Sequence, residues 1–211
     1  MSAYSWKQEN FPVIGLTGPL SSGKSFVAGI AKTLGMNLLN SDDIAKDILL
    51  RSSRIQKEAK LITSIEPILK NGSINKDFAR TLFSDPMMLD QYESILHPLV
   101  LEEIQIIIGS FNKPYPKGLL IESAIWRRLD NTPHFDAMWV VKAPRDMRSE
   151  RFIKKTHQNS EFFLKIESHQ QKLNHKITAP IFEIINDGRE LRERIEEVIN
   201  ETITLWLQHR I

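Results

Sequence analysis

The sequence contains no cysteine, which excludes disulfides and thiolate-bound metal sites. It has no run of the roughly 18 apolar residues that a membrane-spanning helix needs, and no apolar stretch of signal-peptide type near Lys7 and Glu9. The net charge is only +2, and acids interrupt the basic residues that a nucleic-acid-binding face would concentrate. We therefore expect a cytoplasmic protein with no membrane or nucleic-acid partner, present as a monomer or weak oligomer.

Five short apolar runs predict the buried strands of a mostly parallel sheet covered by helices on both faces. They are residues 12–17 (PVIGLT), 36–40 (MNLLN), 118–122 (GLLIE), 137–141 (AMWVV) and 181–185 (IFEII). Helical spacing of apolar residues follows the first run, at Phe26, Val27, Ile30, Ala31 and Leu34, and recurs from Leu191 to Trp206. Residues 44–111 are helix-rich and too long for a simple crossover, so they predict a small helical lobe. The two prolines of KPYPKG, residues 113–118, predict a loop.

A phosphate-binding loop is predicted between the first strand and its helix, where GPLSSGKS spans Gly18 to Ser25. In such a loop, backbone N–H groups surround a phosphate at the start of a helix. Lys24 would then reach the β- and γ-phosphates, and the Ser25 hydroxyl would bind Mg²⁺. This pattern predicts ATP and Mg²⁺ as cofactors. The residues expected to hold the nucleotide here are Gly18, Pro19, Leu20, Ser21, Ser22, Gly23, Lys24, Ser25 and Phe26.

Further stretches, in order along the chain, resemble the dephospho-coenzyme A kinases. NSDDIAKDIL resembles the family's Asp-x-Asp segment, with Asp42 on the second aspartate and Asn40 in place of the first. RTLFSDP and ILHPLV match at Arg80, Phe83, His97 and Pro98; LLIES matches at Glu122; IESHQ and IINDG match at Ile166, Gln170, Asn186 and Gly188. The resemblance covers about Val13 to Gly188, and the order and spacing of these weak motifs make it specific.

The resemblance implies an α/β fold with a P-loop kinase core, a helical coenzyme A lobe and a mobile lid, within one domain spanning residues 1–211. We place the core at about 11–46 and 112–211, the lobe at about 47–111 and the lid at about 144–176. The implied reaction moves the γ-phosphoryl of ATP to the ribose 3′-hydroxyl of dephospho-coenzyme A. Asp42, Lys24 and Arg151 would be catalytic, Asp42, Arg80, His97 and Glu122 would bind substrate, and Asn186 and Gly188 would hold the adenine.

Several of these residues have structural alternatives. Ser41 followed by two aspartates is also typical of a helix start, and spacing does not choose between Asp42 and Asp43. Asn186 to Gly188 also fits a tight turn between strand and helix. A lone histidine before proline, such as His97, more often has a structural role, either in packing or in fixing a helix start.

Arg148, Arg151 and Lys155 share one helix face, which is either a basic stripe over ATP or a solvated surface. The family has Gln-x-x-Arg-x-x-x-Arg there, so only Arg151 is identical, and we favour it for a role in catalysis. Two alternative functions stay open: a P-loop kinase for another nucleotide or nucleoside, and a non-catalytic nucleotide-binding protein.

Overall fold

The computed structural model of the protein describes residues 6–111, 115, 117–123, 126, 134–171 (169–171 by their backbone alone) and 178–209. The chain forms two compact units, one of Met1–Asn40 with Asn112–Ile211 and the other of Ser41–Phe111. This division falls a little before the boundary expected at residue 47. Most of the predicted loop at 113–118 and the end of the predicted lid, from residue 172, lie outside the described residues.

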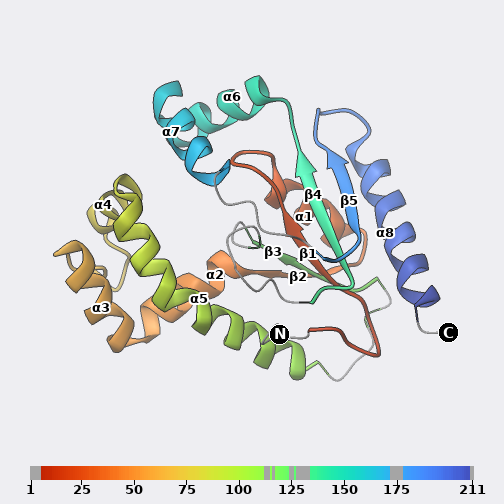
Figure 1. Ribbon diagram of the computed structural model, residues 1–211, viewed down its shortest axis with the longest axis horizontal. Coiled ribbons are helices and arrows are strands. Elements are labelled where there is room, and N and C mark those ends of the chain that lie inside the picture. Colours follow the sequence, from red (N-terminus) through yellow and green to blue (C-terminus); the bar gives the residue numbers. More distant parts are fainter. Residues whose placement is uncertain are drawn as a thin grey trace. The chain divides into compact units, whose positions relative to one another are not determined.

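The first unit is built on a parallel sheet whose strands are ordered β2-β3-β1-β4-β5, with β1 in the centre (Figure 1). The strands are β1 (Val13–Thr17), β2 (Asn37–Asn40), β3 (Leu119–Glu122), β4 (Ala137–Lys142) and β5 (Ile181–Ile185). The helices of this unit are α1 (Lys24–Thr33), α6 (Arg145–Thr156), α7 (Ser160–Gln171) and α8 (Leu191–Gln208). All five predicted strands are therefore present, and the predicted α/β fold class is confirmed.

One face of the sheet is covered by α1 and α8. Ile14 and Leu16 of β1 lie in a buried cluster with Val27 of α1 and Ile195 and Ile199 of α8, so these helices pack where the apolar spacing predicted. Figure 1 shows α8 alongside β5, and α6 and α7 beyond the carboxyl end of β4.

The opposite face carries an aromatic cluster. Trp6, Trp126 and Phe135 meet edge to face, with ring centroids 5.2–5.6 Å apart. Gly15 of β1 leaves room for this layer, since a Cβ there would lie 2.7 Å from the Met138 side chain. Both faces of the central strands are therefore buried, as expected for parallel strands.

Three expectations about burial were wrong. β5 is an edge strand, and its apolar residues Ile181 and Ile185 are 51% and 41% exposed. β2, at the other edge, is only half-buried along its length. Phe26 is 63% exposed, because it lies on the side of α1 that faces away from the sheet core. Sequence periodicity identified the elements but not which strands lie at the edges of the sheet.

The second unit contains only helices among its named elements: α2 (Ser41–Arg51), α3 (Ser53–Thr63), α4 (Lys76–Ser84) and α5 (Pro86–Gly109). Side chains cap three of them, since Ser52 accepts from Ile55 N, Asn75 from Asp77 N, and Asp85 from Met87 N. α5 packs against the other three, and its buried face includes Tyr92, whose pKa burial raises to about 12.

Pro98 lies inside α5, so His97 is in the middle of a long helix. The idea that His97 fixes a helix start was therefore wrong. None of the helices in the described ranges is long and apolar enough to cross a membrane.

Candidate active site

The predicted phosphate loop connects the carboxyl end of β1 to the first residue of α1, at Lys24. Both glycines of the motif are required by close packing. A Cβ at Gly18 would lie 2.4 Å from the Val141 carbonyl oxygen, and one at Gly23 would lie 2.1 Å from Asn186 Nδ2. Gly23 also has φ +93°, a conformation that favours glycine. The loop therefore fits closely against the ends of β4 and β5.

The Lys24 ammonium lies over the loop, where it donates to the carbonyl oxygens of Gly18, at 3.0 Å, and Pro19, at 3.3 Å. The hydroxyl of Ser25 donates to Glu122 Oε1 at 2.6 Å, and Asn40 Nδ2 donates to Glu122 Oε2 at 3.2 Å. These residues follow or end β1, β2 and β3, whose carboxyl ends lie at one edge of the parallel sheet. Ligands of open α/β sheets bind at this edge.

This group of oxygens fits a magnesium ion. Mg²⁺ prefers hard oxygen ligands and takes few of them from the protein, because water and substrate phosphates supply the rest. The Ser25 hydroxyl and the Glu122 carboxylate already lie side by side, and Asn40 fixes that carboxylate. Within the described ranges there is no cluster of three or more histidine, aspartate or glutamate residues that would hold a metal without such help.

The outer side of the loop is held by hydrogen bonds to its carbonyl groups. Asn186 Nδ2 donates to the Ser22 oxygen at 2.8 Å, and Arg151 Nη1 approaches the same oxygen at 3.4 Å. Arg151 Nη2 also reaches the Asn186 backbone oxygen at 3.3 Å. Arg151 therefore contacts the loop directly, whereas Asn186 is a buried support of the loop.

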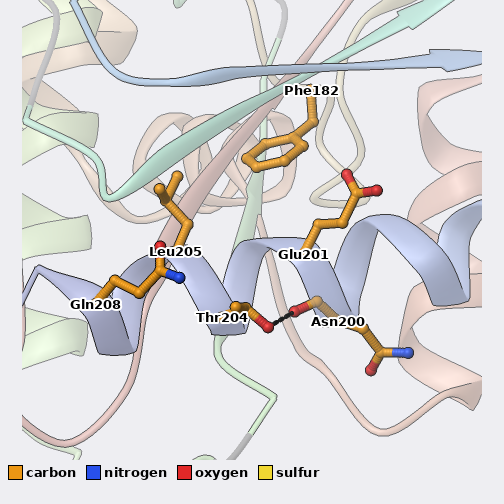
Figure 2. Close-up of a pocket in the computed structure, with 6 residues that line it drawn as sticks. All are labelled: Phe182, Asn200, Glu201, Thr204, Leu205 and Gln208. Carbon is orange, nitrogen blue, oxygen red and sulfur yellow. Dashed lines mark hydrogen bonds between the residues drawn. The ribbon is translucent and has the colours of Figure 1, made fainter.

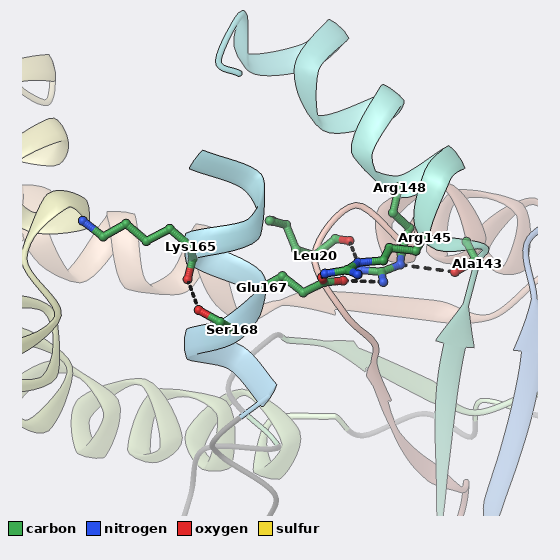
Figure 3. A network of polar contacts seen from close by, with 7 residues as sticks. All are labelled: Leu20, Ala143, Arg145, Arg148, Lys165, Glu167 and Ser168. Atoms are coloured by element: carbon green, nitrogen blue, oxygen red, sulfur yellow. Dashed lines mark hydrogen bonds and ion pairs between the residues drawn. The ribbon is translucent and has the colours of Figure 1, made fainter. Parts of the chain in front are cut away.

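Arg148 differs from the exposed basic stripe that the spacing of α6 suggested. Its side chain is 9% exposed and pairs at 2.5 Å with Glu167 of α7, which also accepts from Arg145 (Figure 3). Burial raises the pKa of Glu167, but hydrogen bonds from Arg148 and Arg145 outweigh this effect and hold the pKa below its ordinary value. Lys155 is exposed, so Arg148, Arg151 and Lys155 do not form one uniform surface.

The other residues predicted to bind the acceptor lie in the second unit. Asp42 and Asp43 are in the first turn of α2, both exposed, and Asp43 pairs with Lys46 at 3.0 Å. Arg80 is exposed on α4 and pairs with Asp77 at 2.9 Å. His97 is half-buried on α5, 4.0 Å from Glu93.

A separate cavity of about 400 Å³ lies between β5 and α8 and is lined by Phe182, Asn200, Glu201, Thr204, Leu205 and Gln208 (Figure 2). None of the predicted site residues lines it. The chemistry of this protein is therefore expected at the loop and not in this cavity.

Sequence reasoning missed Glu167, and it missed the contact between the Asn186 side chain and Ser22. Glu167 lies 19 residues from Arg148, and Asn186 lies 164 residues from Ser22. No local pattern joins such pairs. The burial of Glu167 is a property of the folded chain, so the sequence carried no signal for it.

Comparisons with known proteins agree with this geometry. A profile of the family described as dephospho-CoA kinase matches residues 12–191. A dephospho-CoA kinase of Legionella pneumophila (strain Lens) is 27% identical over 188 residues, which cover 88% of this chain and 92% of that protein.

Two solved structures share the fold. TT1252 from Thermus thermophilus has a TM-score of 0.67 at 22% identity, covering 93% of this chain and 98% of that one. A dephospho-CoA kinase from Campylobacter jejuni has a TM-score of 0.52 at 19% identity, covering 90% and 97%. The family match extends from the strand before the phosphate loop to the start of α8, and this chain belongs to the dephospho-CoA kinase family.

Proposed function

We propose that this protein transfers the γ-phosphoryl group of ATP to the ribose 3′-hydroxyl of dephospho-coenzyme A, giving coenzyme A and ADP. The observation that carries the proposal is the complete phosphate loop from Gly18 to Ser25, set between β1 and α1, in a chain whose residues 12–191 match the dephospho-CoA kinase family. Phosphoryl transfer depends mainly on positioning and on balancing the charge of the transferred group. The residues around the loop are of the kinds that this task requires.

The nucleotide would be held by the loop residues Gly18, Pro19, Leu20, Ser21, Ser22, Gly23, Lys24, Ser25 and Phe26. Lys24 would leave the carbonyl groups of Gly18 and Pro19 for the β- and γ-phosphates, since an ammonium binds a phosphate oxygen more strongly than a neutral carbonyl. Arg151 would balance charge that develops during transfer, because its guanidinium already lies against the loop. Asn186 and Gly188 would hold the adenine through their backbone groups.

Ser25 would supply the protein's ligand to Mg²⁺, with Glu122 next to it. The ion's contribution is to neutralise charge on the β- and γ-phosphate oxygens. Glu122 also belongs to the residues that the family resemblance assigns to the acceptor. Its position against Ser25 and Asn40 supports a place where nucleotide and acceptor meet.

The acceptor would be oriented by Asp42, which would accept the proton of the 3′-hydroxyl. The family resemblance favours Asp42 over Asp43 for this task, because it places Asp42 on the second aspartate of the Asp-x-Asp segment. The helical unit would bind the rest of dephospho-coenzyme A, with Arg80 and His97 among the contacts, and α6 with α7 would serve as the lid. We propose a monomer or weak oligomer as the working state.

The purified protein should be incubated with ATP, Mg²⁺ and each of several acceptors, with ADP release as the readout. We expect ADP release that depends on dephospho-coenzyme A and exceeds the release with adenosine or other nucleosides. Turnover only with other acceptors would contradict the proposed substrate, and ATP binding without turnover would contradict the proposed activity. The Lys24→Ala variant is the control for contaminating kinases.

A further inference from the structure

The phosphate loop contains one strained residue, Ser21, whose φ of 57° is in the left-handed region although it is not glycine. Such a conformation costs on the order of 1–3 kcal/mol and persists only when neighbouring groups fix it. The carbonyl groups on both sides of Ser21 are held from outside the loop. Arg148 Nη1 donates to the Leu20 oxygen at 3.3 Å, and Asn186 and Arg151 donate to the Ser22 oxygen.

The orientation of these carbonyl groups decides where the loop's N–H groups point. In a trans peptide the C=O and the following N–H point in opposite directions, and the described residues include no cis peptide. When the Leu20 oxygen is turned toward Arg148, the N–H of Ser21 is turned away from it. Because the arginine lies outside the loop, this orientation presents the N–H group to a phosphate held within the loop.

Arg148 can hold Leu20 only while its own charge is balanced. Its guanidinium donates to three groups: the Ala143 oxygen at 3.2 Å, the Leu20 oxygen at 3.3 Å and Glu167 Oε1 at 2.5 Å. The only carboxylate among these groups is Glu167, whose side chain is 3% exposed. A buried guanidinium without a carboxylate would move toward water, because burying an uncompensated charge is costly.

We propose that Glu167 is a positioning residue for the nucleotide phosphates: by holding Arg148 it orients the Leu20–Ser21 peptide and so the phosphate loop. Glu167 does this from α7 without contacting the loop itself in any hydrogen bond found here (Figure 3). Through this contact, the start of α6 and the described turns of α7, which belong to the proposed lid, also support the phosphate site. This inference rests on the proposed use of the loop for ATP, and it extends the site to Glu167, a position of the IESHQ stretch that the family motif does not specify.

The test is the affinity of Glu167→Gln for ADP, measured by titration calorimetry with Mg²⁺ and without acceptor. Glutamine keeps the size of the side chain but loses its charge. We expect ADP to bind about 10-fold more weakly, the effect of losing one hydrogen bond to a charged phosphate. The affinity for AMP, which lacks the β-phosphate, should fall by less than roughly 2-fold. General damage to the fold would instead lower the affinity for both ligands.

The matched control is Arg145→Gln. Arg145 donates to the same carboxylate, at 2.8 Å, but its side chain is 65% exposed and it pairs with Glu167 and not with the loop. Exposed ion pairs contribute little, so ADP affinity should change by less than about 2-fold. If Arg145→Gln lowered the affinity for ADP as much as Glu167→Gln does, the proposal that Glu167 acts through Arg148 would be contradicted.

Hydrogen exchange provides a second readout, and it shows the loop directly. In Glu167→Gln the amides around Ser21 should exchange faster, although the substituted residue is on another element. If Glu167→Gln does not fold, Arg148→Met is the substitute, since it keeps an apolar stem against Phe163 and leaves Glu167 paired with Arg145. Arg148→Met should lower the affinity for ADP to the same degree.

Wild-type affinity for ADP and unchanged loop exchange in these variants would overturn the inference. A wild-type protein that binds ADP but does not phosphorylate dephospho-coenzyme A would contradict the proposed function instead. The comparison of ADP affinities would still decide the role of Glu167.

Discussion

Lys24 is the residue that we expect to contact the phosphates of ATP most directly. In the structure its ammonium is held by the carbonyl groups of Gly18 and Pro19, so it is already placed over the loop. Lys24→Ala should lower ATP-dependent turnover by about 10²-fold or more, the scale for removing a charge-stabilising donor. The circular dichroism spectrum should be unchanged, because Lys24 is at the first position of α1. Near wild-type turnover would show that the loop is not a phosphate site.

Asp42 and Asp43 are neighbours in α2, but only Asp42 acts as the base in the proposed mechanism. A ribose hydroxyl is a poor nucleophile at neutral pH, so loss of a positioned base should be costly. Asp42→Asn should lower kcat by roughly 10²- to 10⁴-fold while both substrates still bind. Asp43→Asn is the matched control, and it should have a mild effect because Asp43 points about 100° away from Asp42 on the same helical turn and its pair with Lys46 is exposed. Reversed effects would assign the base to Asp43, and two mild effects would leave Asp42 as a helix-start residue.

Residue roles were predictable where a local motif carries them. The loop from Gly18 to Ser25 was identified by its spacing, and its two glycines proved to be packed too tightly for a side chain. Arg148 was misjudged, because spacing along α6 does not reveal which side of the helix is buried. Its partner Glu167 comes from α7, and only the folded chain brings the two together.

At the scale of elements, the bounds of the strands were predicted more accurately than their burial. β5 matches the predicted residues 181–185, but its exposure was not foreseen. Whether a strand is at the edge follows from the order of strands in the sheet, and that order is not contained in any one segment. A helix start near His97 is likewise not observed, because α5 continues through Pro98.

Replacing each of two glycines in or next to α1 with alanine should change the stability of the protein in opposite directions. Gly29 is inside the helix with nothing within 4 Å of an added Cβ, so Gly29→Ala should stabilise the protein by about 1 kcal/mol. Gly23 is at the start of the same helix, and Gly23→Ala should destabilise it, because its backbone is left-handed and Asn186 occupies the space. Thermal unfolding of the two variants checks both signs. A stabilising Gly23→Ala would contradict the described loop packing.

The pairing of α6 with α7 predicts an acid-sensitive contribution to stability. Glu167 has an ordinary pKa of 4.5 in the unfolded chain and a lower pKa in the folded protein. Its contribution is therefore fully present above about pH 4.5 and is lost as the pH falls from there through the folded pKa. Glu167→Gln should lower the free energy of unfolding by about 3 kcal/mol at pH 7, because it leaves Arg148 buried without its carboxylate. The difference from wild type should shrink as the pH falls below 4.5, as measured by urea unfolding; a constant difference would contradict the pairing.

For the whole molecule, the family and the fold class were recognisable from the sequence because short motifs occur in a fixed order from Val13 to Gly188. The assembly of the site was not recognisable in the same way. Residues of α6 and Asn186, just after β5, support a loop that begins at Gly18, and these contacts join segments far apart in the chain. Parallel sheets have this property in general, since their sites are formed by loops from separate strands.

The proposed reaction moves the γ-phosphoryl group of ATP to one particular hydroxyl of dephospho-coenzyme A. The most direct measurement is phosphorus NMR of the product made by the purified protein from ATP, Mg²⁺ and dephospho-coenzyme A. We expect one new phosphomonoester, coupled to the ribose 3′ proton, formed in equal amount to ADP and absent with Lys24→Ala. Release of ADP with inorganic phosphate alone, or a phosphomonoester at another position, would contradict the account.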